Sequence, residues 1–354
     1  MGKLSKCYLI GAGASFGHCD LDSIDTPPTG EWIFADAWKK GILKLDEFEP
    51  FFDKLVSYLD DQGELNELEP DELEYNSEIL LKELHEEVED SYQQVLTGAG
   101  SPTDSLKDTQ AALGTCYYLL YELFRRYSNS FSPEHSYYTD LAKQIEKESA
   151  SVVSLNYDVL MEKSIRHTGQ NFYYLPDSQN EDGVPIAKVH GSINLLNDFG
   201  SGIKIDSEKF TEKARNIHLN TTHNSEIRQL SFEELERYDF RNLVFGMETQ
   251  YEPVIIPPLA KHKNYNKTSI YRSIWDFAGD ILSQTNELVI IGTSLTANDE
   301  QLLNLLESNL QDNIKITVVC GQQSKSVKAQ LNMRVENPSF DLDYTYFKDY
   351  VDNI

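Results

Sequence analysis

The sequence predicts an α/β protein built on a Rossmann-like parallel sheet with helices on both faces, plus a large helical insertion. Short, strongly apolar runs recur at 7–10, 151–155, 287–291 and 314–320, and segments with helical patterning lie between them. Such alternation is typical of a parallel sheet covered on both faces. A glycine-rich turn also follows the first apolar run directly, as in nucleotide-binding α/β proteins. The length of 354 residues is ample for such a core.

The first predicted strand, residues 7–10, runs into the turn Gly11-Ala12-Gly13-Ala14-Ser15, and Gly17 follows. Glycines at these places let the backbone come close to a phosphate, which is favoured at the start of a helix. The spacing Gly-x-Gly-x-x-x-Gly is one residue longer than the ordinary dinucleotide fingerprint. A strand, turn and helix without a ligand is therefore the alternative interpretation.

About 130 residues separate the first strand from the second, which is too long for a simple crossover. Helices are expected at 31–59, 78–96 and 109–127, and the last is apolar on nearly every face, so it should be buried in its bundle. The predicted organisation has a nucleotide-binding domain at 1–21 and 149–354. A helical insertion subdomain occupies 22–148, and an irregular second insertion occupies 197–250.

Regular elements continue after the insertion in the order expected for a parallel sheet. The predicted elements are strand 151–155, helix 159–167, short strands 185–189 and 253–256, strand 287–291, helix 301–310, and strand 314–320, which ends at Gly321.

Polar residues follow several of these strands at their carboxyl ends. Asn156 and Asp158 follow the second strand, His190 follows the strand at 185–189, and Gly292 and Ser294 follow the strand at 287–291. Taken singly, Asn156, Asp158 and Ser294 could be helix caps, and His190 could be a turn residue. Parallel strands end at one edge of the sheet, where ligands bind, so their joint placement predicts one pocket.

Composition limits the kind of protein and its partners. The net charge of −27 disfavours direct binding to nucleic acid. The acidic stretch 46–90 is either a solvated helical face or a docking surface for a basic partner. The four cysteines lie far apart, and no run is apolar enough to span a membrane. We expect a cytoplasmic protein that contacts no membrane.

Four motifs taken in order resemble the sirtuin NAD-binding domain: Gly-Ala-Gly-x-Ser at 11–15, Asn-x-Asp at 156–158, His-Gly-Ser at 190–192 and Gly-Thr-Ser-Leu at 292–295. With the stretches 254–258 and 291–299, the chain resembles more closely the sirtuin-like NAD-hydrolysing domains of bacterial antiphage defence systems. Leu155 stands where sirtuins have Gln. The Asp-Phe-Arg stretch and the structural zinc module of sirtuins are missing.

The resemblance implies a role for each matching residue. The implied NAD-binding residues are Gly11, Ala12, Gly13, Ser15, Gly292, Ser294 and Gly321. Asp158 would hydrogen-bond the nicotinamide carboxamide, Asn156 would position the ribose or the attacking water, and His190 would act as general base. The implied chemistry needs no metal.

The missing zinc module favours NAD glycohydrolase activity, which yields nicotinamide and ADP-ribose, in an antiphage effector that depletes NAD. Two alternatives keep the same site: a deacylase or ADP-ribosyltransferase that needs an acceptor, and a non-catalytic sensor of NAD or ADP-ribose. Because a free NAD hydrolase would harm its host, we expect a homo-oligomer, a regulatory partner protein, or both. The partner would be a helicase-type ATPase or a nucleic-acid-guided protein.

Overall fold

The computed structural model describes part of the chain in detail. The described residues are 6–20, 26–29, 33–42, 77, 80–81, 83–84, 104–175, 182–201, 227–238, 249–255, 269–295 and 299–354. The chain forms two compact units, which we describe separately. The first comprises Met1–Pro28, Tyr127–Ile193 and Pro258–Ile354, and the second comprises Thr29–Arg126 and Asn194–Pro257.

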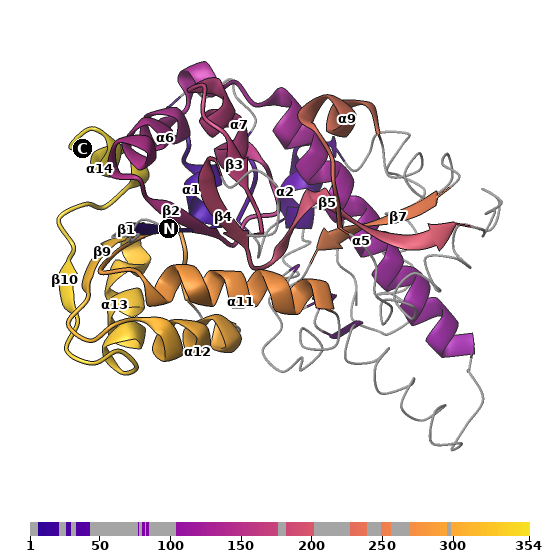
Figure 1. Ribbon diagram of the computed structural model, residues 1–354. Coiled ribbons are helices and arrows are strands. Elements are labelled where there is room, and N and C mark those ends of the chain that lie inside the picture. The colour runs from indigo at the N-terminus through magenta and orange to yellow at the C-terminus, as the bar shows by residue number, and fades with distance from the viewer. Residues whose placement is uncertain are drawn as a thin grey trace. The chain divides into compact units, whose positions relative to one another are not determined.

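The first unit contains a seven-stranded sheet in the order β10-β9-β8-β1-β2-β4-β3 (Figure 1). Every neighbouring pair in it is parallel, which confirms the predicted α/β class. Its strands are β1 (Lys6–Ile10), β2 (Ser151–Ser154), β3 (Phe172–Tyr173), β4 (Val184–Lys188), β8 (Glu287–Ile291), β9 (Lys315–Val319) and β10 (Ser339–Asp341).

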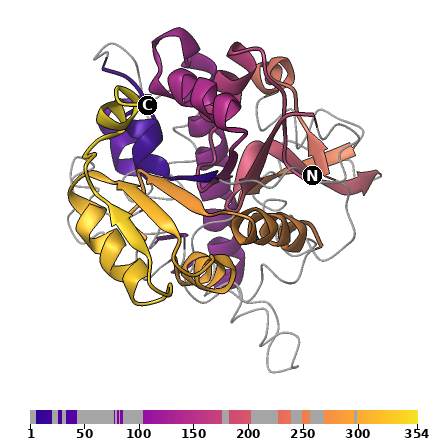
Figure 2. The same ribbon diagram turned by 60° about the vertical axis from the view of Figure 1, so that its left-hand side comes forward.

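Helices cover both faces of this sheet. On one face lie α11 (Ser269–Ser283), α12 (Glu300–Asn309) and α13 (Ser324–Asn332), and the turned view in Figure 2 keeps them on that side. On the other face lie α1 (Ala12–Phe16), α6 (Tyr137–Glu148), α7 (Leu160–His167) and α14 (Phe347–Val351). Short 3₁₀ turns, η4 (Pro133–His135) and η8 (Gly321–Gln323), complete the unit.

The central strand β1 shows why its sequence reads as a continuous apolar run. Cys7 and Leu9 join the core cluster that β8, β9 and helices α11 to α13 form. Tyr8 points to the opposite face, where its ring meets Tyr350 of α14 at 6.4 Å between centroids. A strand buried on both faces has no polar side to alternate with, so the period-two pattern disappears.

The second unit contains α2 (Ile33–Lys39), α9 (Phe232–Arg237) and most of α5 (Asp104–Ser130). A three-stranded sheet in the order β6-β5-β7 is formed by β5 (Gly191–Ser201), β6 (Ile227–Gln229) and β7 (Thr249–Ile255), and apart from the start of β5 it belongs to this unit. The described part of 197–250, which the sequence predicted to be irregular, therefore contains regular structure. β6 is a short strand without a buried residue, so its apolar signal is weak.

The predicted helix at 109–127 is present as α5 and is buried at 116–121, as expected. Residues 137–148, which the sequence assigned to the insertion, form α6 and belong to the first unit. Most of the expected helices at 31–59 and 78–96 lies outside the described residues. The division at 22–148 otherwise stays a prediction. None of the helices in the described stretches combines the length and apolarity needed to cross a membrane.

Candidate functional site

The glycine turn after β1 packs directly on the loop after β8. The Gly11 N–H donates to the Ile291 carbonyl at 2.9 Å, and the Gly13 N–H donates to the Gly292 carbonyl at 2.8 Å. A Cβ on Gly11 would lie 2.7 Å from the Gly292 oxygen. Gly292 has a φ of +68°, and its Cβ would lie 2.1 Å from the Ala14 nitrogen. Both loops need glycine because backbone meets backbone here.

This contact lies at the switch point of the sheet. The chain passes from β1 to β2 on one side and later returns to β8 on the other side of β1. Ligands of open α/β sheets bind at such a point, beyond the carboxyl ends of the strands. The structure thus brings Gly11, Gly13 and Gly292 together where the sequence predicted a site.

The glycine turn nevertheless uses much of its hydrogen-bonding capacity within the protein. Besides the two bonds to the β8 loop, the Ala14 N–H donates to the Gly11 carbonyl at 3.0 Å. Helix α1 has five residues, so few aligned peptide dipoles stand behind the turn. The proposed contacts of this turn with a phosphate therefore stay a prediction.

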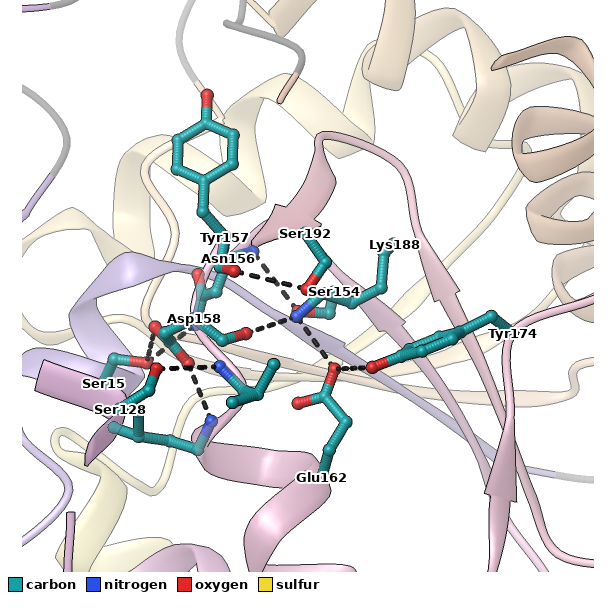
Figure 3. A network of polar contacts seen from close by, with 12 residues as sticks. Ser15, Ser128, Ser154, Asn156, Tyr157, Asp158, Glu162, Tyr174, Lys188 and Ser192 are labelled. Atoms are coloured by element: carbon teal, nitrogen blue, oxygen red, sulfur yellow. Dashed lines mark hydrogen bonds and ion pairs between the residues drawn. The ribbon is translucent and has the colours of Figure 1, made fainter. Parts of the chain in front are cut away.

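Ser15, Asn156 and Asp158 form one buried hydrogen-bond network (Figure 3). The Ser15 hydroxyl donates to Asp158 Oδ2 at 2.8 Å, and Asn156 Nδ2 donates to Ser15 Oγ at 2.9 Å. Asn156 Nδ2 also lies 3.2 Å from the Gly11 carbonyl oxygen. The network therefore connects the end of β2 to the glycine turn.

The amide oxygen of Asn156 is the exception in this network. Asn156 is 6% exposed, and its Oδ1 atom is buried without a hydrogen-bond partner among the described residues. A buried polar atom left unpaired costs about 1–3 kcal/mol. The carbonyl oxygen of Asn156 thus keeps unused capacity to accept a hydrogen bond.

Asp158 serves the following helix as well as the network. Its Oδ1 accepts a hydrogen bond from the Leu160 N–H at 3.1 Å, at the start of α7. The N-cap residue of α7 is Val159, so Asp158 is not the cap itself, although its carboxylate binds the first N–H of the helix from the preceding position. Burial raises the pKa of the Asp158 carboxyl group, and the nearby Lys188 ammonium opposes that rise.

His190 follows β4 and is buried beside Tyr157, with 6.4 Å between the ring centroids. Burial lowers the pKa of His190 to about 4, against a hydrogen bond to the Leu155 backbone that favours the charged form. The imidazole is therefore neutral at pH 7. Within the described residues, no hydrogen bond joins His190 to Asn156 or Asp158.

The two other predicted residues lie at the same edge of the sheet, outside this network. Ser294 is half-buried in the loop after β8. Gly321 begins η8 after β9, has a φ of +56° and donates its N–H to the Thr345 carbonyl at 2.8 Å. The ring of Tyr346 lies 3.5 Å from the position of a Cβ on Gly321.

Several buried residues of the site were not predicted. The hydroxyl of Tyr138, from α6, lies 2.9 Å from Ser15 Oγ. Helix α6 begins there because the Ser136 side chain accepts from the Tyr138 N–H at 3.1 Å. His18 is 1% exposed and stacks with the Tyr138 ring, and its Nδ1 has no hydrogen-bond partner within the residues that the structure describes. Burial lowers the pKa of His18 to about 4.

A buried ion pair lies next to the network. Lys188 and Glu162 are each 1% exposed, and their Nζ and Oε1 atoms lie 2.9 Å apart. The sequence carried one signal of this pair, because Lys188 is a charged residue at the end of an otherwise apolar strand. In the described parts of the chain, no group of three His, Cys, Asp or Glu side chains could hold a metal ion.

Comparisons with known proteins give a weak likeness to sirtuins. No family model matches the chain, and no curated protein matches it. A structure from a study of sirtuin substrate affinity aligns with 98% of this chain and 90% of its own, at 12% identity and a TM-score of 0.37. Sir2 bound to an inhibitor, 2'-O-acetyl-ADP-ribose and a deacetylated peptide aligns at 11% identity, a TM-score of 0.38, and 98% and 91% coverage. These values are low, so the likeness by itself assigns no activity.

Substituting Gly292 tests the contact between the two loops. We expect Gly292→Ala to lower the free energy of unfolding by more than about 3 kcal/mol, because its Cβ would meet backbone atoms. Gly169 also has a positive φ of +87°, but nothing lies within 4 Å of its Cβ position. Gly169→Ala should therefore cost only about 1–2 kcal/mol. If urea unfolding gives the same loss of free energy for both variants, the close backbone packing at Gly292 is contradicted.

The two buried histidines predict acid sensitivity. Each folded-state pKa of about 4 lies below the usual 6.5, so the unfolded chain binds more protons between these values. The stability that each contributes is complete above pH 6.5 and falls as pH decreases toward 4. From pH 7 to 5 the loss is about 2 kcal/mol per histidine. Urea unfolding at the two pH values should show a smaller loss of unfolding free energy for His18→Gln than for wild type, by about the amount that one histidine contributes. A pH dependence unchanged by this substitution would contradict the burial of a neutral His18.

Proposed function

We propose that this chain binds NAD+ and hydrolyses it to nicotinamide and ADP-ribose. The observation that carries the proposal is the buried Oδ1 of Asn156, which has no hydrogen-bond partner in the described part of the chain. It belongs to a network that contacts the glycine turn at the switch point, and the neutral His190 follows the neighbouring strand β4. The order of the four motifs supports NAD as the ligand.

In this proposal the dinucleotide lies along the carboxyl edge of the sheet. Its pyrophosphate approaches the glycine turn, and because the Gly13 amide is already bonded to Gly292, the phosphate contact is assigned to the Ala12 N–H. Ser294 and Gly321, at the ends of β8 and β9, are assigned to the adenosine side. The nicotinamide end is assigned to Asp158 and Asn156.

The proposed reaction breaks the bond between C1' of the ribose and the ring nitrogen. Nicotinamide leaves with the bonding electron pair as a neutral ring, and positive charge develops on the ribose. Water adds to C1', and its proton passes to a base, which gives ADP-ribose. Asn156 Oδ1 accepts a hydrogen bond from the water or a ribose hydroxyl and so orients it. Neutral His190 accepts the proton, although a pKa of about 4 makes it a weak base.

One observation favours the alternative of a non-catalytic sensor. The Gly13 amide and the Ser15 hydroxyl are already engaged inside the protein, so a nucleotide could act by rearranging these bonds. A deacylase or ADP-ribosyltransferase would use the same residues with a protein acceptor. For the hydrolase, we further propose an antiphage role and control by a partner protein or by self-association, because unregulated hydrolysis would deplete the NAD of the host.

The decisive test is to incubate the purified chain with NAD+ and to measure nicotinamide and ADP-ribose by chromatography. We expect product from wild type, and a loss of about 10²-fold or more in kcat for Asn156→Ala and His190→Ala. Matched controls are Asn332→Ala on the exposed side of α13 and His167→Ala at the end of α7, which should retain activity.

The outcomes separate the candidate functions. Full activity in both Asn156→Ala and His190→Ala would contradict the mechanism. Nicotinamide release only when an acylated peptide or other acceptor is supplied would identify a deacylase or transferase. Measured NAD+ binding by wild type, with no turnover under any condition including added partner protein, would identify a sensor.

A further inference from the structure

The buried pair of Lys188 and Glu162 contacts the proposed site at one atom. Besides Glu162, the Lys188 ammonium donates a hydrogen bond to the backbone carbonyl of Asp158 at 2.6 Å (Figure 3). Lys188 therefore connects β4 with the turn that carries Asn156 and Asp158. His190 comes two residues after Lys188, just beyond the end of β4.

The register of the sheet explains why Lys188 points toward this turn. Val153 and Ala187 are partners in register, and both belong to the core cluster on the side of α11 to α13. Side chains alternate along a strand, so Lys188 faces the opposite side, where α7 supplies Glu162. Its ammonium thus lies under the carboxyl edge rather than at the surface.

Stability alone does not account for this pair. Burying two charges costs more than a packed apolar pair of similar size unless all their polar atoms are satisfied. Here the Glu162 Oε1 accepts from the Tyr174 hydroxyl at 3.1 Å, but Glu162 Oε2 has no partner among the described residues. The carboxylate of the pair is therefore only partly hydrogen-bonded within the described residues. The hydrogen bond from Lys188 to the Asp158 carbonyl, in contrast, is short.

We propose that Lys188 is a positioning residue, whose hydrogen bond to the Asp158 carbonyl holds the Asn156–Asp158 turn in register with His190. Its charge also favours the ionised form of Asp158, which accepts from Ser15 and Leu160. Lys188 acts through the backbone of this turn and not through contact with the substrate. The effect of Lys188 on catalysis rests on the proposed function. The effect of its charge on the ionisation of Asp158 does not.

Other titratable groups lie near Lys188 and Asp158, and their charges affect the direction in which the Asp158 pKa shifts. They are Glu162 of α7, Tyr138 of α6, Tyr174 after β3, and His190 after β4. Burial raises the pKa of Tyr138 well above its usual value, and burial lowers that of His190, so both are neutral near pH 6. Among the described residues, the ion pair beside Asp158 is that of Lys188 and Glu162.

The test compares the full chain with two variants: Lys188→Met/Glu162→Gln, which avoids leaving Glu162 unpaired, and Glu162→Gln alone. Carbon-13 NMR of aspartate side chains, with Asp158→Asn for assignment, measures the Asp158 pKa directly. We expect this pKa to rise in the double variant, because the stronger neighbouring charge is lost. We expect it to fall in Glu162→Gln, because Lys188 then acts uncompensated.

The second readout is the pH profile of NAD+ hydrolysis. In the double variant we expect kcat/KM to fall by about 10–100-fold, with the acid limb moved to higher pH. The matched control is Lys143→Met, which removes a lysine from an exposed i,i+3 pair on α6 and should change neither readout. Circular dichroism establishes that each variant is folded.

These readouts separate failure of this inference from failure of the proposed function. An unmoved Asp158 pKa in the folded double variant would overturn the role of Lys188, whatever the activity. A moved pKa with unchanged kcat/KM in an active enzyme would overturn the positioning role. If wild type does not hydrolyse NAD+, the proposed function fails, while opposite pKa shifts in the two variants would still support the coupling of Lys188 to Asp158.

Discussion

The structure of the site depends on one contact, in which the backbone of the turn after β1 meets the backbone of the loop after β8. The contact is close enough that a Cβ on either Gly11 or Gly292 would lie within 2.7 Å of another residue's atoms. It fixes where α1 begins, and so it places Ser15 over the end of β2, where it can donate to Asp158. The side-chain network is thus a consequence of a backbone constraint.

Burial then determines the chemistry of the side chains collected there. The same low dielectric lowers the pKa of His190 and raises the pKa of Asp158, because it disfavours the charged form in each case. Lys188 opposes that effect at Asp158, and Glu162 compensates Lys188 in turn. The protonation states of the site therefore depend on charges that are far from solvent and close to one another.

The sequence predicted the parts of the structure that depend on local pattern. Strands β1 and β8 are apolar runs bounded by glycine, so their ends were predictable, and parallel strands necessarily bring Asn156, Asp158 and Gly292 to one edge. Tyr138 was missed because its helix follows a long insertion and nothing local assigns it to the sheet. Lys188 and Glu162 were missed as a pair because their contact depends on β4 lying beside β2, which is a property of strand order. The strands β3 and β10 are too short for a periodic signal.

The proposed reaction places particular demands on these charges. Positive charge would develop on the ribose as nicotinamide leaves, so nearby acceptors such as the Asn156 oxygen and the Asp158 carboxylate would stabilise the transition state. A free ammonium in the same place would oppose it, since charges interact strongly where the dielectric is low. Pairing Lys188 with Glu162 cancels most of its field at longer range, while its hydrogen bond to the Asp158 carbonyl still acts at contact distance. A lysine can therefore hold this turn in place with little electrostatic penalty to a cationic transition state.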